Sequence, residues 1–121
     1  MIKTSTKYYV GIDAGGTKTE FVLTDESGLV LSQTVKGSAN PNDITIDKAY
    51  RVLSDGLKEL LQGREIDRRN LYIFAGVAGT GVGENASLLR DMLLQGYKNV
   101  SVSTDLVNAL EIALGDEDGL R

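Results

Sequence analysis

One short segment of the chain combines acidic, glycine and hydroxyl residues between two stretches that read as strands. It runs DAGGTKT and contains Asp13, Gly15, Gly16, Thr17, Lys18 and Thr19. A tight hairpin with two glycines lets backbone amides approach an anion closely, the threonines add hydroxyl donors, and Asp13 can hold a hydrated Mg²⁺. A bare pair of glycines would more simply indicate an ordinary hairpin. The added carboxylate and hydroxyls favour phosphate binding.

Two further polar residues are candidates for a site. Asp105 follows the strand-like NVSVS and begins a helical pattern, so it fits either an N-cap or a carboxylate at a ligand crevice. If the Asp13 loop ends a neighbouring strand of the same sheet, both carboxylates face one crevice, the usual ligand position in open α/β sheets. Asn40 fits equally a loop former before Pro41 and a hydrogen-bonding partner of a sugar hydroxyl.

Two other nucleotide motifs fit less well. Gly11 to Thr17 approaches a P-loop, but Thr17 stands where the lysine should follow the second glycine, and a strand is expected downstream where that motif has a helix. Gly79 to Glu84 follows a strand and opens a helix, as a dinucleotide fingerprint does, but Glu84 occupies the third glycine position. The second motif remains a weak rival.

The composition bounds the class of protein. A chain of 121 residues with 41% hydrophobic and 25% charged residues predicts one folded domain with a modest core. The net charge of -4, without a Lys/Arg cluster, favours neither nucleic acid nor a membrane surface as partner. With 0 cysteines and 0 histidines, any chemistry must use carboxylates, hydroxyls and backbone amides. The N-terminal residues lack the apolar core of a secretory signal, so the default location is the cytoplasm.

The apolar pattern predicts the elements that position these residues. Strands are expected at Lys7 to Asp13, Glu20 to Thr24, Leu29 to Val35, Leu71 to Gly79 and Asn99 to Ser103, and helices at Ile46 to Leu61, Glu84 to Gln95 and Asp105 to Leu114. Gly63 is well placed to stop the first helix. The order βββαβαβα predicts an α/β fold in which an antiparallel meander continues into a mixed sheet covered by helices.

Four segments, in this order, resemble a known family. GIDAGGTKTEFVLTDESGLVL resembles the opening phosphate motif of the acetate/sugar kinase, Hsp70 and actin superfamily. GGTKTE, GSANPND, AGVAGTG and STDLVNALEIAL together resemble the BadF/BadG/BcrA/BcrD ATPase family, which includes N-acetylglucosamine kinases. The resemblance runs through nearly the whole chain.

The resemblance implies a ribonuclease H-like, actin-like nucleotide-binding lobe and an enzyme that uses ATP and Mg²⁺ to phosphorylate an amino sugar. In that family the glycine hairpin wraps the ATP phosphates and the residue matching Thr17 contacts the nucleotide. Asp13 would organise Mg²⁺, Asn40 would contact the sugar, and Asp105 would be the catalytic carboxylate. Gly79 and Thr80 match a loop that lines the sugar pocket.

The family pattern departs from this chain in one respect. Its second phosphate loop, adenosine-binding segment and second lobe would lie beyond Arg121, so residues 1–121 are expected to form the N-terminal lobe and to be nearly inactive alone. The face that the second lobe covers would be apolar and would favour a homodimer of this lobe. Two alternatives stay open: an ATP-hydrolysing activator of a reductase or dehydratase, and a non-catalytic nucleotide or sugar sensor.

Overall fold

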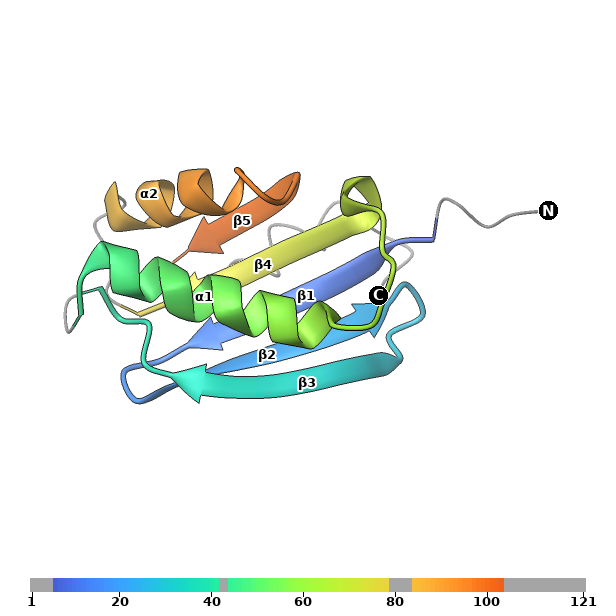
Figure 1. Ribbon diagram of the computed structural model, residues 1–121, viewed down its shortest axis with the longest axis horizontal. Helices are drawn as coiled ribbons and strands as arrows, with labels where there is room; N and C mark the ends of the chain where they lie inside the picture. Colours follow the sequence, from blue (N-terminus) through green and yellow to red (C-terminus); the bar gives the residue numbers. More distant parts are fainter. Residues whose placement is uncertain (1–5, 42–43, 79–83, 104–121) are drawn as a thin grey trace.

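A five-stranded mixed sheet with helices on one face forms the framework of the chain (Figure 1). The computed structural model describes residues 6–41, 44–78 and 84–103. The elements are β1 (Tyr8–Ala14), β2 (Lys18–Asp25), β3 (Val30–Gly37), α1 (Ile46–Leu61), the short 3-10 helix η1 (Arg68–Asn70), β4 (Leu71–Val77), α2 (Glu84–Leu93) and β5 (Asn99–Ser103). The strands lie in the order β3-β2-β1-β4-β5.

The sheet divides at β1 into an antiparallel and a parallel half. β2 pairs antiparallel with both β1 and β3, and a register shift after Leu23 interrupts the second pairing. β4 pairs parallel with both β1 and β5. The carboxyl ends of β1, β4 and β5 therefore meet at one edge of the sheet, together with the β1–β2 hairpin.

The core lies between one face of the sheet and the helices. Alternate residues of β1 and β2 are fully buried on this face because strand side chains point to opposite faces in turn. α1 packs its leucines, among them Leu53 and Leu57, into the same cluster, and α2 adds Leu89. In Figure 1 both helices lie on the same side of the sheet. Gly56 of α1 faces the Phe21 ring of β2 so closely that an added Cβ would overlap it.

The ends of α1 explain where this helix begins and stops. Thr45 is the N-cap and its side-chain hydroxyl accepts a hydrogen bond from the Lys48 amide. After the C-cap Gln62, Gly63 has a φ of 79°, the left-handed conformation that glycine adopts without a steric penalty. The predicted role of Gly63 as the helix stop is confirmed.

Most sequence expectations for the elements are confirmed, with small shifts at their ends. The meander, α1, β4, α2 and β5 all form, and the mixed α/β sheet is as predicted. β2 and β3 extend further than expected because ladder pairing continues from Lys18 to its partner Gly37. α2 ends at Leu93, before the expected Gln95, and η1 was not predicted. The helix expected at Asp105 to Leu114 falls outside the described residues.

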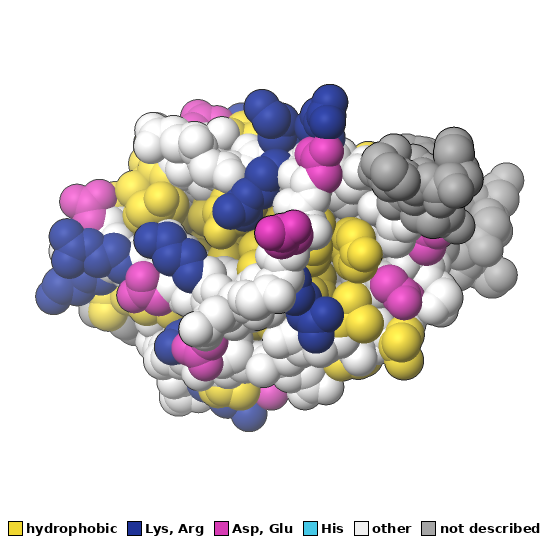
Figure 2. All heavy atoms as spheres, turned by 45° about the vertical axis from the view of Figure 1, so that its right-hand side comes forward, with side chains coloured by type: hydrophobic (Ala, Val, Ile, Leu, Met, Phe, Trp, Pro, Cys, Tyr) yellow, Lys and Arg dark blue, Asp and Glu magenta, His cyan; other side chains and the backbone are white. Residues whose placement is uncertain are grey.

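One face of the molecule carries charged side chains of both signs (Figure 2). Figure 2 shows Lys and Arg side chains interspersed with Asp and Glu over the visible face. Within the described ranges, no helix is long and apolar enough to cross a membrane.

Candidate functional site

The direction of the chain across the sheet reverses between β1 and β4. From β1 the strands proceed outward through β2 to β3, and after α1 the chain returns to β4 on the other side of β1. Such a reversal leaves room for a ligand beyond the carboxyl ends of the two strands. The Ala78 amide donates to the Ala14 carbonyl at 2.9 Å, so the two strands stay joined up to this point. Asp13 and the glycine hairpin lie at this edge.

A row of three residues crosses the parallel strands at this edge. Asp13 pairs in register with Gly76 of β4, and Gly76 pairs with Ser103 of β5. Neighbouring strands are about 4.8 Å apart, so the backbones at Asp13 and Ser103 are roughly 10 Å apart. Because Gly76 has no side chain, no Cβ of β4 stands between them at this level.

The carboxylate of Asp13 lies on the sheet face opposite α1. Val10, Ile12 and Ala14 of β1 point into the core, while Asp13 is exposed. Its partner across the hairpin is Glu20, which forms a 3.5 Å ion pair with Lys18. This end of the sheet thus presents two carboxylates and one ammonium group beside the hairpin.

The glycines of the hairpin are not required by the backbone or by packing against other described residues. In the described part of the chain, positive φ values occur only at Gly28 and Gly63. An added Cβ at Gly16 would meet nothing within 4 Å, and one at Gly15 would meet only the Lys18 carbonyl oxygen at 3.5 Å. Glycine at both positions leaves the hairpin backbone open to the close approach of another molecule. Gly16, Thr17 and Lys18 are exposed to such a molecule.

Thr19 lies differently from the other residues of this segment. Its side chain is fully buried, and its hydroxyl donates a 2.7 Å hydrogen bond to the Gly37 carbonyl. The hydroxyl points to the helix-covered face, away from Asp13, because Thr19 alternates with the exposed Glu20 along β2. We therefore expect Thr19 to anchor the hairpin, with Thr17 as the residue whose hydroxyl is accessible to a phosphate.

Asn40 lies in the loop between β3 and α1. Its backbone amide donates to the Ser38 hydroxyl oxygen at 3.2 Å, and its backbone carbonyl accepts from the Ile44 backbone amide at 3.1 Å. Ala39 beside it is fully buried in the core. The backbone on both sides of Asn40 is thus held in place, as a binding loop requires.

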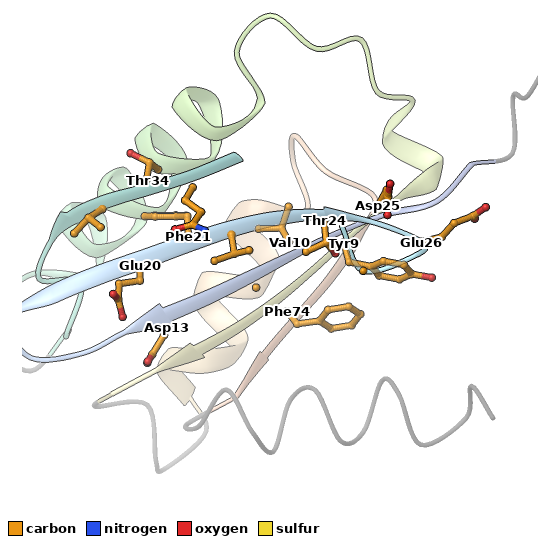
Figure 3. Close-up of a pocket in the computed structure, with 15 residues that line it drawn as sticks. Tyr9, Val10, Asp13, Glu20, Phe21, Thr24, Asp25, Glu26, Thr34 and Phe74 are labelled. Atoms are coloured by element: carbon orange, nitrogen blue, oxygen red, sulfur yellow. The ribbon is translucent and has the colours of Figure 1, made fainter. Parts of the chain in front are cut away.

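A cavity of about 780 Å³ lies against the face of the sheet that carries Asp13. Figure 3 shows Asp13 and Glu20 at one end, with Tyr9 and Phe74 toward the other. The Tyr9 ring stacks with Tyr72 and Phe74 at centroid distances of 5.7 and 6.4 Å, which gives the cavity an aromatic wall. Most of the cavity runs along β1, β2 and β3, so only its Asp13 end belongs to the phosphate-binding candidate.

The described residues fit Mg²⁺ only in part. Among them no group of three or more acidic, cysteine or histidine side chains could hold a metal ion. Mg²⁺ bound with a nucleotide usually takes one or two carboxylates, several waters and the phosphates themselves. The exposed Asp13 beside the open hairpin would supply the carboxylate of that set.

Three predicted site residues, Gly79, Thr80 and Asp105, lie outside the described residues. Gly79 and Thr80 come directly after Ala78 at the switch point, and Asp105 comes two residues after Ser103. The strands that lead to these residues end at the same edge as β1. The sequence reasoning missed Gly76 and the bond from Thr19 to Gly37, because both depend on strand register.

Comparison with known proteins identifies the class. The fold is that of an α/β nucleotide-binding lobe, and residues 10–117 match the BadF/BadG/BcrA/BcrD ATPase family. The chain belongs to this family.

Two known proteins are similar to most of this chain. The chain is 34% identical over 111 residues to N-acetylmuramic acid/N-acetylglucosamine kinase of Clostridium acetobutylicum, covering 89% of this chain and 35% of that protein. It is 35% identical over 121 residues to caprolactamase subunit alpha of Pseudomonas jessenii, covering 95% of this chain and 16% of that protein. It thus spans about a third or less of these two relatives.

Solved structures share the fold at lower identity. A provisional N-acetylglucosamine kinase from Chromobacterium violaceum superposes with a TM-score of 0.71 at 24% identity, covering 93% of this chain and 40% of that one. A Ppx/GppA family member from Aquifex aeolicus superposes with a TM-score of 0.51 at 14% identity, covering 80% and 35%. These likenesses confirm the predicted α/β ATPase-lobe fold.

Proposed function

We propose that the protein transfers the γ-phosphoryl group of ATP to a hydroxyl of an amino sugar such as N-acetylglucosamine, and that this chain supplies one lobe of the site. The observation that carries the proposal is the open hairpin at Gly15 and Gly16 beside the exposed Asp13, at the carboxyl edge of the sheet. The relative from Clostridium acetobutylicum, a kinase of two amino sugars, supports the substrate class.

The residues of this chain would act mainly by positioning. Phosphoryl transfer needs an in-line approach of the acceptor hydroxyl and neutralisation of the phosphate charge. Backbone amides and the Thr17 hydroxyl at the hairpin would hold the phosphates, and Asp13 would hold Mg²⁺ through water. When bound, Mg²⁺ neutralises charge on the phosphate oxygens.

Asn40 and Asp105 would serve the acceptor. The Asn40 side chain would bind a sugar hydroxyl, with Gly79 and Thr80 lining the same pocket. Asp105 would orient the hydroxyl that is phosphorylated and accept its proton late in the transfer, since a carboxylate is a weak base for an alcohol. Its placement therefore matters more than its pKa.

The test uses the complete reading frame that encodes this chain. ATP-dependent phosphorylation is measured for N-acetylglucosamine, glucosamine, glucose and N-acetylmannosamine, with Asp105→Asn as the comparison. We expect one amino sugar to be phosphorylated and Asp105→Asn to lower kcat by a factor of about 10² to 10⁴ while sugar binding persists. Turnover of none of these sugars would refute the proposal.

The second candidate is ATP hydrolysis coupled to another enzyme's reaction. It is favoured by the 35% identity to a caprolactamase subunit, a relative whose name does not describe a sugar kinase. In the same assay, ATP hydrolysis that is independent of any sugar would support this candidate. Nucleotide or sugar binding without turnover would instead indicate a sensor.

A further inference from the structure

The buried hydroxyl of Thr19 joins the two loops that the proposed reaction must hold together. Among the described residues, Thr19 is the one polar residue that is buried, with 0% of its surface exposed. Its hydroxyl donates to the Gly37 carbonyl at 2.7 Å, across a separation of 18 residues. The donor is buried and the acceptor residue Gly37 is exposed, so the bond links a core side chain to the surface end of β3.

The two ends of this bond lie directly beside the two candidate loops. On one side, Thr19 comes two residues after Thr17 in the hairpin, and its neighbour Lys18 pairs with Gly37. On the other side, Gly37 is the last residue of β3 and comes three residues before Asn40. The hydrogen bond therefore lies between the hairpin and the Asn40 loop.

The Asn40 loop is also held by the core and by hydrogen bonds of its own backbone. Ala39 is buried in the core, and the amides of Asn40 and Ile44 are bonded within the loop itself. Those local bonds shape the loop but do not set its distance from the hairpin. The Thr19 hydroxyl bonds the last residue of β3 to β2, next to the Lys18–Gly37 pair of the ladder, so it reinforces the register at the point where the loop begins.

We propose that Thr19 is a positioning residue that holds the Asn40 loop in fixed register with the Gly15 to Thr17 hairpin. The role of Thr19 in the reaction rests on the proposed function, in which the hairpin holds the phosphoryl donor and the Asn40 loop holds the acceptor. Thr19 then fixes the distance between donor and acceptor without touching either. A small error in that distance lowers the rate of transfer more than it weakens the binding of either substrate.

The test compares three substitutions. Thr19→Val keeps the shape of the side chain but removes the hydroxyl, and Thr19→Ser keeps the hydroxyl but removes the methyl group. Thr34→Val is the matched control: it removes a threonine hydroxyl of β3 that donates to Glu59 at 2.6 Å, away from both loops.

The first readout is hydrogen exchange in the protein without substrates. Thr19→Val should speed exchange at the Asn40 and Ile44 amides roughly tenfold, the change that a free energy of about 1.4 kcal/mol produces. Thr19→Ser and Thr34→Val should leave these amides as they are in the parent protein. Unchanged exchange in Thr19→Val would overturn the proposal whether or not the protein is a kinase.

The second readout is the kinetics of the complete protein. Thr19→Val should lower kcat roughly tenfold at saturating substrates and change the KM for ATP less than twofold. Thr19→Ser, which keeps the hydroxyl, should have the kcat of the parent protein. Equal kcat in the parent and Thr19→Val would refute the role in transfer. If the parent phosphorylates no sugar, the proposed function fails and the exchange measurement alone decides whether Thr19 holds the loop.

Discussion

Replacing Gly56 by alanine tests the close packing of α1 on the sheet. An added Cβ at this position would lie closer than 3.0 Å to three atoms of the Phe21 ring, a separation that real Cβ atoms essentially never show. The ring is 1% exposed and surrounded by core side chains, so it has little room to move aside. The helix must then shift or the ring must leave its rotamer.

Two opposing effects determine the size of the change. Alanine favours the helix by about 1 kcal/mol over glycine. Overpacking a well-filled core costs about 1–3 kcal/mol, and a cost at the upper end outweighs the helical gain. We expect Gly56→Ala to lower the free energy of unfolding by about 1–2 kcal/mol, which lowers Tm by roughly 3–10 °C in a domain of this size.

The assay is thermal and urea unfolding followed by circular dichroism. Gly96→Ala is the control, because an added Cβ at Gly96 would meet nothing within 4 Å. A second variant, Phe21→Leu, replaces the ring by a smaller side chain and should cost less stability when Gly56→Ala is already present. An unchanged or higher Tm for Gly56→Ala would refute the overlap.

Three further predictions concern Asp67, Gly63 and Asp13. Arg69 donates side-chain and backbone hydrogen bonds to Asp67, and these bonds lower the pKa of the Asp67 carboxyl from its ordinary 3.8 to about 2. The stability that the Asp67 carboxylate contributes is therefore present above pH 3.8 and is lost as the pH falls through about 2. Asp67→Asn should flatten the pH dependence of Tm between these two values, and an unaltered profile would contradict the assignment. Gly63→Ala should lower the free energy of unfolding by about 1 kcal/mol, because its left-handed φ of 79° strains alanine; Gly63→Asn should cost less in the same urea titration, and equal losses would argue against backbone strain. Asp13→Asn should weaken Mg²⁺-dependent nucleotide binding about tenfold in the complete protein. Its Tm should stay within about 2 °C of the parent protein's, since the Asp13 side chain is exposed. If calorimetry finds the same nucleotide affinity for the variant and the parent, Asp13 does not hold the metal.

Local patterns in the sequence predicted most of the described elements and the hairpin that joins the first two strands. Short apolar runs and β-forming residues predicted the strands, three- and four-residue spacing predicted α1, and Gly63 marked its end. Asp13 with its glycines pointed to a phosphate because the chemistry lies within seven consecutive residues. These inferences needed no knowledge of which strand lies beside which.

The tertiary structure decided the features that depend on strand register and packing. Thr19 looked like a hydroxyl donor to a ligand, and only its pairing opposite the end of β3 shows that it donates to Gly37. Gly76 lies beside Asp13 because β4 pairs with β1 in parallel, a contact between residues 63 positions apart. Gly56 is a poor residue for the middle of a helix by propensity alone, and its reason is the Phe21 ring from another element. Local sequence fixes conformation through short-range sterics and hydrogen bonds, whereas these neighbours are chosen by the packing of the whole chain.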